Sequence, residues 1–128
     1  MATIHTRIEG SLLIVSVSGV LTAEEVASVI AQYYSNGIVK DVIWDIAIGS
    51  LSFISNDGFR EIAGVANKAL ESGARQGGKT AYIGSAEQEY GVLKMYTAIA
   101  ELTGVPTQYN VFGTIKEARN WIDQNFEC

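Results

Sequence analysis

The chain of 128 residues has nine basic and 14 acidic residues, a net charge of −5 and 48% hydrophobic content, which fits one compact soluble domain spanning residues 1–128. No basic cluster is present, which argues against nucleic acid as a partner because phosphate backbones require clustered cations. No apolar run approaches the ~20 residues of a membrane-spanning helix. The one cysteine, Cys128, excludes an internal disulfide. A single cysteine fits a reducing compartment, and the N-terminus lacks the features of a signal peptide. Both observations predict a cytoplasmic protein.

The N-terminal part predicts a hairpin followed by a helix. Two β-type runs, Thr3–Ile8 and Leu12–Ser18, are joined by Glu9-Gly10-Ser11 and should pair antiparallel. Thr22 and Glu25 have the spacing of a capping box, in which each residue satisfies a backbone N–H at the helix start. The residues with helical spacing that this helix should bury are Val26, Val29, Ile30 and Tyr33.

The most informative segment follows this helix. The apolar run Val42–Ile48 is short and rich in β-branched residues, which predicts a buried strand. We expect Asp45 to lie at the exposed end of that strand and to accept hydrogen bonds from loop N–H groups, because burial without partners would be costly. A loop then brings Ser55-Asn56-Asp57-Gly58 to the first turn of a helix, where ligands and partners commonly bind in α/β sheets. The buried stripe of that helix should be Phe59, Ile62, Ala63, Ala66 and Leu70.

The C-terminal half predicts two further strand–helix pairs. The strands are Lys79–Gly84 and Thr107–Phe112, and capping boxes at Ser85 and Thr114 begin the helices. The element order is therefore β-β-α-β-α-β-α-β-α. Strands that alternate with helices after a first hairpin predict an α/β domain with a mixed, mainly parallel sheet.

Two patterns that could indicate chemistry have simpler explanations. The segment from Gly73 to Thr80 matches the letters of a phosphate-binding loop, but such a loop follows a strand and begins a helix, and here the order is reversed. We interpret it as a Gly-rich turn that leads into a strand. His5 is the only histidine and has no Cys or carboxylate at ligand spacing, so neither a metal site nor a Ser-His-Asp arrangement is expected. The sequence predicts a protein that is not an enzyme and has no cofactor.

The element order and the strand-to-helix segment resemble the SpoIIAA-like group, the fold of STAS domains and anti-sigma-factor antagonists. More closely, the chain resembles an uncharacterised bacterial branch described as STAS/Sec14-like. The stretch from Trp44-Asp45-Ile46 to Phe53-Ile54-Ser55-Asn56-Asp57-Gly58-Phe59 is similar to a family stretch in which Asp-Leu-Ser is followed by Ile-Asp-Ser-Ser-Gly at a helix start. Asp45 matches the first Asp of that pattern, and Gly58 matches the Gly. The resemblance implies a βα superhelix packed around a mixed sheet.

The chain departs from the family pattern at the switch position. In antagonist members the residue before the Gly is a phosphorylatable Ser or Thr, whereas this chain has Asp57, and it has Ser55 where the family usually has Asp. A fixed carboxylate cannot be switched by a kinase. Its charge is nevertheless favourable at a helix N-terminus, by roughly 0.3–1 kcal/mol.

The first functional hypothesis is a non-catalytic domain that binds an apolar or lipid-like small molecule, as the Sec14-like resemblance implies. The ligand would lie between the helix at Asp57 and the helix near Ser85, because Met and aromatic side chains opposite small ones can line an apolar cavity. The same pattern also describes a close-packed core. The residues assigned to this site are Ser55, Asp57 and Tyr90 as polar anchors, with Phe59, Ala63, Met95 and Tyr96 as the lining.

The alternative hypothesis is a protein-interaction module that resembles an anti-sigma-factor antagonist, with Asp57 holding it in a phosphorylated-like state. Ser, Asn and Asp are also the preferred helix N-caps, so capping alone explains part of this cluster. Tyrosines outside the core stripes, Tyr34, Tyr90 and Tyr109, would suit a protein interface, and a homodimer is possible through the hairpin edge or the Tyr-bearing helices. The residues assigned to the partner are Asp45, Ser55, Asn56, Asp57 and Gly58.

Overall fold

The computed structural model describes residues 3–34, 39–50, 54–69, 78–84, 91, 93–94, 96–98 and 108–123, with the backbone alone for residues 47–50 and 56. The chain begins with strands β1 (Thr3–Glu9) and β2 (Leu12–Val20), which pair antiparallel. Between them Gly10 has φ +65°, a conformation that favours glycine in a tight turn. The predicted hairpin is confirmed.

Helix α1 (Ala23–Tyr33) begins at the predicted capping box. The Glu25 N–H donates to Thr22 Oγ1 at 3.2 Å, and the Thr22 N–H donates to Glu25 Oε1 at 3.0 Å. Three of the four residues expected to face the core, Val26, Val29 and Ile30, are buried, while Tyr33 is half-buried.

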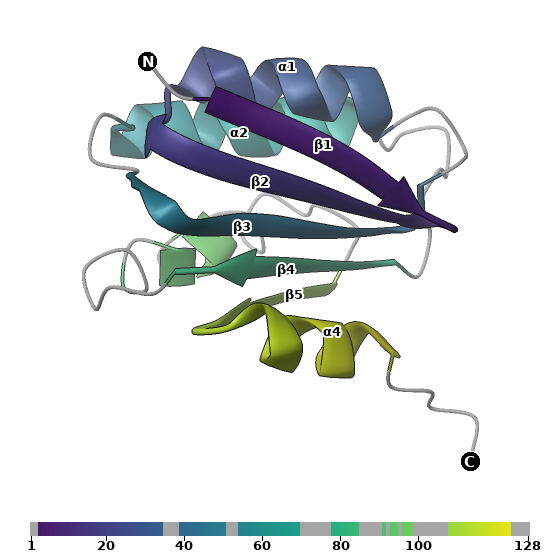
Figure 1. Ribbon diagram of the computed structural model, residues 1–128. Helices are drawn as coiled ribbons and strands as arrows, with labels where there is room; N and C mark the ends of the chain where they lie inside the picture. The colour runs from purple at the N-terminus through teal and green to yellow at the C-terminus, as the bar shows by residue number, and fades with distance from the viewer. Residues whose placement is uncertain are drawn as a thin grey trace.

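The sheet has the strand order β1-β2-β3-β4-β5 in the described residues, so spatial order follows chain order (Figure 1). The remaining strands are β3 (Asp41–Ser50), β4 (Lys79–Ile83) and β5 (Gln108–Phe112). Each pairs parallel with the strand before it, and among the described strands β1 and β2 alone pair antiparallel. The predicted mixed, mainly parallel sheet is confirmed.

Alternating side chains of the strands divide the core between the two faces of the sheet. Helices α1 and α2 (Asn56–Ala69) cover one face, where Val42, Trp44 and Ile46 point. Helix α4 (Ile115–Asp123) covers the other face through Ala118 and Ile122, and Thr114 caps this helix by accepting from the Glu117 N–H at 3.3 Å. The described residues between 91 and 98 are helical, and Leu93 and Tyr96 join the core with α1 and α2.

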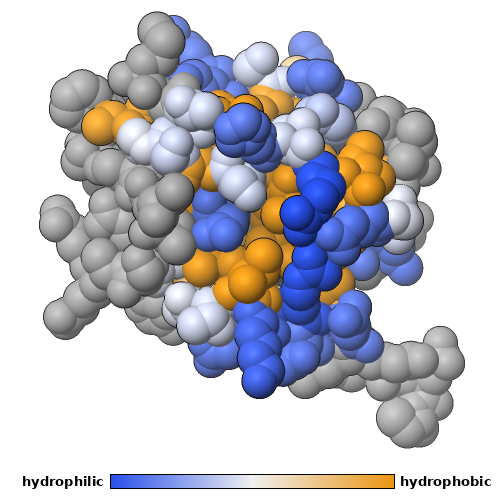
Figure 2. All heavy atoms as spheres, in the orientation of Figure 1, coloured by the Kyte–Doolittle hydropathy of each residue, from blue (hydrophilic) through white to orange (hydrophobic). Residues whose placement is uncertain are grey.

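The surface of the sheet is not covered evenly. Helix α4 contacts β3, β4 and β5, and on the hairpin the side chains of β1 are mostly exposed. Figure 2 shows hydrophilic side chains crossing the viewed face beside hydrophobic ones. None of the helices in the described ranges is long and apolar enough to cross a membrane.

Strand β3 is longer than the sequence predicts, and this moves Asp45 away from the strand end. The strand continues to Ser50, because its last residues pair with β2 beyond the point where β4 stops. Asp45 therefore lies in the middle of β3, opposite Ser16 on β2 and Ile83 on β4. Its neighbours Trp44 and Ile46 point toward α1 and α2, so the half-buried Asp45 side chain points to the opposite face. The expected position at an exposed strand end is wrong.

Strand β4 begins at Lys79, as predicted for the end of the Gly-rich segment. Lys79, which would contact phosphate in a phosphate-binding loop, is the first residue of this strand and is buried. Its Nζ donates to the Trp121 carbonyl at 2.8 Å and lies 5.3 Å from the centroid of the Trp121 ring. These two contacts with Trp121 link the start of β4 to α4. Other predicted features lie outside the described residues, namely Leu70, the turn before Gly78, and the Ser85 capping box.

Candidate functional site

The N-terminus of α2 is built on Ser55. The Gly58 N–H donates to Ser55 Oγ at 3.1 Å, and the Phe59 N–H donates to the Ser55 carbonyl at 2.9 Å. These two bonds define Ser55 as the N-cap residue. Asn56 and Asp57 are already inside the helix, so Asp57 is not needed as the cap.

Replacing Ser55 with alanine should lower the free energy of unfolding by about 1 kcal/mol, because the Gly58 N–H loses its acceptor. Urea unfolding followed by circular dichroism measures this change. Ser55→Asp, which retains an acceptor oxygen, should recover most of the loss. An unchanged midpoint in Ser55→Ala would contradict the assignment of the cap.

Asp57 is the most exposed charged group at this helix start. Its side chain is 95% exposed, and its Oδ1 lies 3.2 Å from Nη1 of Arg60, which is itself 63% exposed. An exposed pair at this spacing contributes little to stability, typically well under ~1 kcal/mol. The sequence reasoning missed Arg60, although its spacing of three residues from Asp57 is the signal of a helical ion pair. Together the two side chains present a charged surface that contributes little to the stability of the fold.

Gly58 allows two helices to approach each other. A Cβ atom at this position would lie 3.1 Å from Ile54 Cγ2 and 3.4 Å from Ala23 Cβ, the first residue of α1. Since 3.1 Å is tighter than ordinary van der Waals contact, a larger side chain would push the start of α2 away from α1. Gly58 thus has a packing role, with the first residue of α1 and the side chain of Ser55 both close to it.

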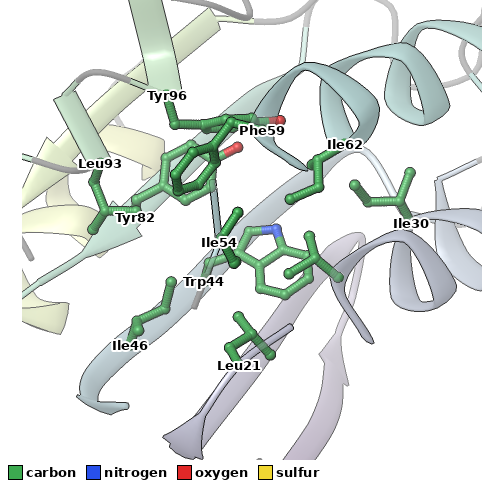
Figure 3. A pocket seen from close by; sticks show the side chains of 11 residues that line it. Leu21, Ile30, Trp44, Ile46, Ile54, Phe59, Ile62, Tyr82, Leu93 and Tyr96 are labelled. Atoms are coloured by element: carbon green, nitrogen blue, oxygen red, sulfur yellow. The ribbon is translucent and has the colours of Figure 1, made fainter. Parts of the chain in front are cut away.

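Three of the four residues expected to line an apolar ligand cavity, Phe59, Ala63 and Tyr96, belong instead to the buried core, and Figure 3 shows Phe59 and Tyr96 side by side. The rings of Phe59 and Tyr96 have centroids 5.4 Å apart, and Tyr82 meets Tyr96 edge-on at 5.5 Å. Ala63 is fully buried in the same core. The space between these side chains measures about 20 Å³, whereas pockets for small molecules usually measure ~300–1,000 Å³. Tyr90 and Met95 lie outside the described residues.

Buried tyrosines dominate the electrostatics of this core. Burial raises the pKa of Tyr82 well above its usual value and also raises the pKa of Tyr96. Tyr34 is buried as well, and its hydroxyl accepts a hydrogen bond from Trp44 Nε1 at 3.0 Å. The prediction that Tyr34 suits an interface is therefore wrong. The burial of the Tyr82 and Tyr96 phenols and the buried hydrogen bond between Trp44 and Tyr34 indicate a packed interior rather than a ligand cavity.

The structure brings together part of the predicted partner site. Ser55, Asp57 and Gly58 share one turn at the start of α2, and the side chain of Asn56 is not described. Asp45 lies on the other face of the sheet and does not join them. In the described part of the chain, no group of three or more His, Cys, Asp or Glu side chains could hold a metal ion.

The fold and site define an α/β domain with a sequentially ordered sheet and an exposed charged helix start. Neither protein-family models nor curated proteins give a match. Among solved structures, the chain is similar to the unphosphorylated anti-sigma factor antagonist SpoIIAA, with a TM-score of 0.59 and 15% identity over 96% of this chain and 100% of that one. An anti-sigma factor antagonist from Mycobacterium paratuberculosis gives 0.63 and 15%, over 97% and 96%.

A third similar structure has no assigned function. It is an uncharacterized protein of the DUF3478 family from Shewanella loihica PV-4 with a SpoIIAA-like fold, at a TM-score of 0.53 and 19% identity over 94% of this chain and 93% of that one. These similarities cover nearly the whole chain in each case. The chain therefore has the SpoIIAA-like fold, as the sequence resemblance predicts.

Proposed function

We propose that this protein is a non-catalytic interaction module that binds a regulatory protein in the cytoplasm through the N-terminus of α2. The contact surface consists of Ser55, Asp57, Gly58 and Arg60. It acts as an anti-sigma-factor antagonist does, with a permanent negative charge at Asp57 in place of a phosphorylatable hydroxyl. Two of the similar structures are anti-sigma factor antagonists, which supports this class of function.

The 95% exposure of the Asp57 side chain is the observation that carries the proposal. Ser55 already caps the helix, so the Asp57 carboxylate is not required for folding and is open to a partner. The positive end of the helix dipole favours a negative charge at this position. A partner with a hydrogen-bond donor or a cationic side chain would complement the carboxylate, and burial in the interface would strengthen that contact.

Binding of an apolar small molecule has less support. The space among Phe59, Tyr82 and Tyr96 is about the size of one water molecule. A lipid-like molecule would have to displace rings that already contact one another at 5.4 and 5.5 Å between centroids. We therefore prefer the protein partner.

The test is a quantitative binding measurement after capture of partners from the lysate of the source cell. A partner identified by mass spectrometry is expressed and titrated against wild type and Asp57→Asn, a neutral variant of the same shape. Asp57→Asn should bind at least about tenfold more weakly, the effect of losing one charge-assisted contact in an interface. Asp57→Ser, if phosphorylated by a kinase from the same cell, should recover affinity.

A matched control separates the effect of the site from that of net charge. Asp123→Asn makes the same change of charge on an exposed residue of α4, on the other face of the sheet, and should leave affinity unchanged. Equal affinity of wild type and Asp57→Asn for every captured partner would refute the proposed site.

A further inference from the structure

Among the described strands, none pairs with the outer edge of β1. It is the first strand in the order of the described sheet, and it pairs on one side with β2. Six of its seven residues are exposed, and the other is half-buried. In an antiparallel ladder, alternate residues of an edge strand direct their N–H and C=O groups away from the sheet. Such an edge is ready to pair with another strand.

A groove runs along this edge between β1 and α1. Its volume is about 480 Å³, and its lining combines strand residues with one side of the helix, including Ile4, Thr6, Glu24, Ser28, Gln32 and Tyr33. The Thr6 and Tyr33 hydroxyls lie 3.0 Å apart across it. A strand added to β1 would place alternate side chains in this groove.

The edge also exposes a hydrophobic side chain. Ile8 is 44% exposed, and it points to the same side of the sheet as Ile4 and Thr6, because it pairs with the buried Leu13 of β2. The groove lies on that side. An exposed isoleucine on an edge strand is a feature that stable sheets usually avoid.

From these observations we propose that two copies of this chain associate through β1, as antiparallel strands related by a two-fold axis at Thr6. This register pairs Thr6 with Thr6 and pairs Ile8 of each copy with Ile4 of the other. The exposed Ile8 is thereby covered, beside an Ile4 that already packs against the main core. The interface is isologous, and the two sheets become one continuous sheet.

The strand sequence favours a second copy over an unrelated strand because it is nearly symmetric about Thr6. Isoleucine lies two residues away on both sides, and basic side chains, His5 and Arg7, lie one residue away on both sides. On the outer side of the sheet, His5 of one copy meets Arg7 of the other. The Arg7 Nε lies 2.8 Å from Glu9 Oε2, and the same carboxylate accepts two hydrogen bonds from Arg119.

Charge also selects this register over the neighbouring symmetric one. An axis at Arg7 would place two guanidinium groups directly opposite each other, which is unfavourable across a strand pair. With an axis at Ile8, the pairing between the two strands would end at the turn at Gly10, and only a short stretch of each strand would be paired. The axis at Thr6 uses the whole of Thr3–Glu9.

The outer side of α1 fits the same axis. Helix α1 joins the parallel strands β2 and β3, so it runs in the direction of β1 (Figure 1). Glu24, Ser28 and Gln32 are spaced four residues apart along the groove and lie on one side of the helix. A two-fold axis at Thr6 makes the two α1 helices antiparallel. The Glu24 carboxylate of one copy then faces the Gln32 amide of the other.

Sedimentation equilibrium of the intact protein over about a hundredfold range of concentration tests the association. Wild type should show a concentration-dependent dimer. Ile8→Lys should raise its dissociation constant by about tenfold or more, because two lysines would replace two covered isoleucines. Ser16→Lys adds the same charge at an exposed position of β2, away from the edge, and should leave the dimer intact.

Cysteine cross-linking tests the register. In a Cys128→Ser background, Thr6→Cys places two thiols directly opposite each other, within the Cα separation that a disulfide allows. Thr3→Cys places them six residues out of register, roughly 20 Å apart. Mild oxidation should yield a covalent dimer from Thr6→Cys and none from Thr3→Cys.

Two outcomes would overturn the inference: a monomeric wild type throughout the concentration range, or a dimer that survives Ile8→Lys and does not cross-link at residue 6. Neither depends on the proposed function, because β1 is not part of the α2 surface. Asp57→Asn should leave the dimer intact, so failure of partner binding and failure of dimerisation would be distinguished.

Discussion

Replacing Phe59 with alanine should lower the free energy of unfolding by about 3–5 kcal/mol. The ring is 3% exposed and packs on Tyr96 with centroids 5.4 Å apart. Its removal would lose the transfer free energy of the ring and leave a cavity at a place where the space between the described side chains measures about 20 Å³. Urea unfolding of both proteins, followed by tryptophan fluorescence, measures the difference.

Phe59→Leu is the matched control, since it keeps most of the apolar volume and should cost clearly less than Phe59→Ala. This comparison also bears on the ligand hypothesis. If Phe59→Ala lost less than ~1 kcal/mol, the ring would not be close-packed, and a cavity for an apolar molecule would regain support. A large loss fits a closed core.

Raising the pH above about 10 should destabilise the fold steeply. Burial raises the folded-state pKa of Tyr82 and Tyr96 above the ordinary tyrosine value of 10.0. In the unfolded chain both phenols ionise near pH 10, whereas in the folded protein they keep their protons. The stabilisation is therefore fully present below pH 10 and is lost as the pH rises further, toward the folded-state pKa. With two such groups, the free energy of unfolding should fall by about 2.7 kcal/mol per pH unit.

The pH dependence of urea unfolding measures that slope, and Tyr96→Phe separates its two sources. The variant removes one ionisable group from the same ring cluster, so the slope should fall to about half, ~1.4 kcal/mol per pH unit. An identical slope in wild type and Tyr96→Phe would contradict the assignment of the alkaline transition to these buried phenols.

Local signals in the sequence predicted most of the fold. The hairpin turn at Gly10, the capping box of Thr22 with Glu25, and the apolar spacing of Phe59, Ile62 and Ala63 all depend on residues close together in the chain. Features that depend on distant segments were missed. The length of β3 could not be predicted, because β2 rather than the local sequence supports its last residues. The burial of Tyr34 likewise depends on Trp44, its hydrogen-bond partner.

The sequence predicted that Ser55, Asn56 and Asp57 lie at the start of a helix, but not how they are arranged there. Ser55, Asn56 and Asp57 can all cap a helix, and the sequence does not show which of them lies just outside it. The structure selects Ser55 and leaves Asp57 exposed. Asp45 was assigned to the partner surface because it matches the first Asp of the family pattern and was expected at the exposed end of its strand. Asp45 lies between Trp44 and Ile46, whose side chains point toward α1 and α2. Because side chains alternate along a strand, this position was the available signal that Asp45 points to the other face of the sheet.

The order of strands in the sheet has a consequence for how the chain folds as it is synthesised. Each described strand pairs with the strand made immediately before it, so a nascent chain can extend its sheet from β1 toward β5 without inserting a late strand between two earlier ones. The hairpin of β1 and β2 needs only a short loop closure, while each parallel strand must wait for its crossover to emerge. During translation the growing edge is always the most recently made strand, and β1 is the edge that stays open from the start.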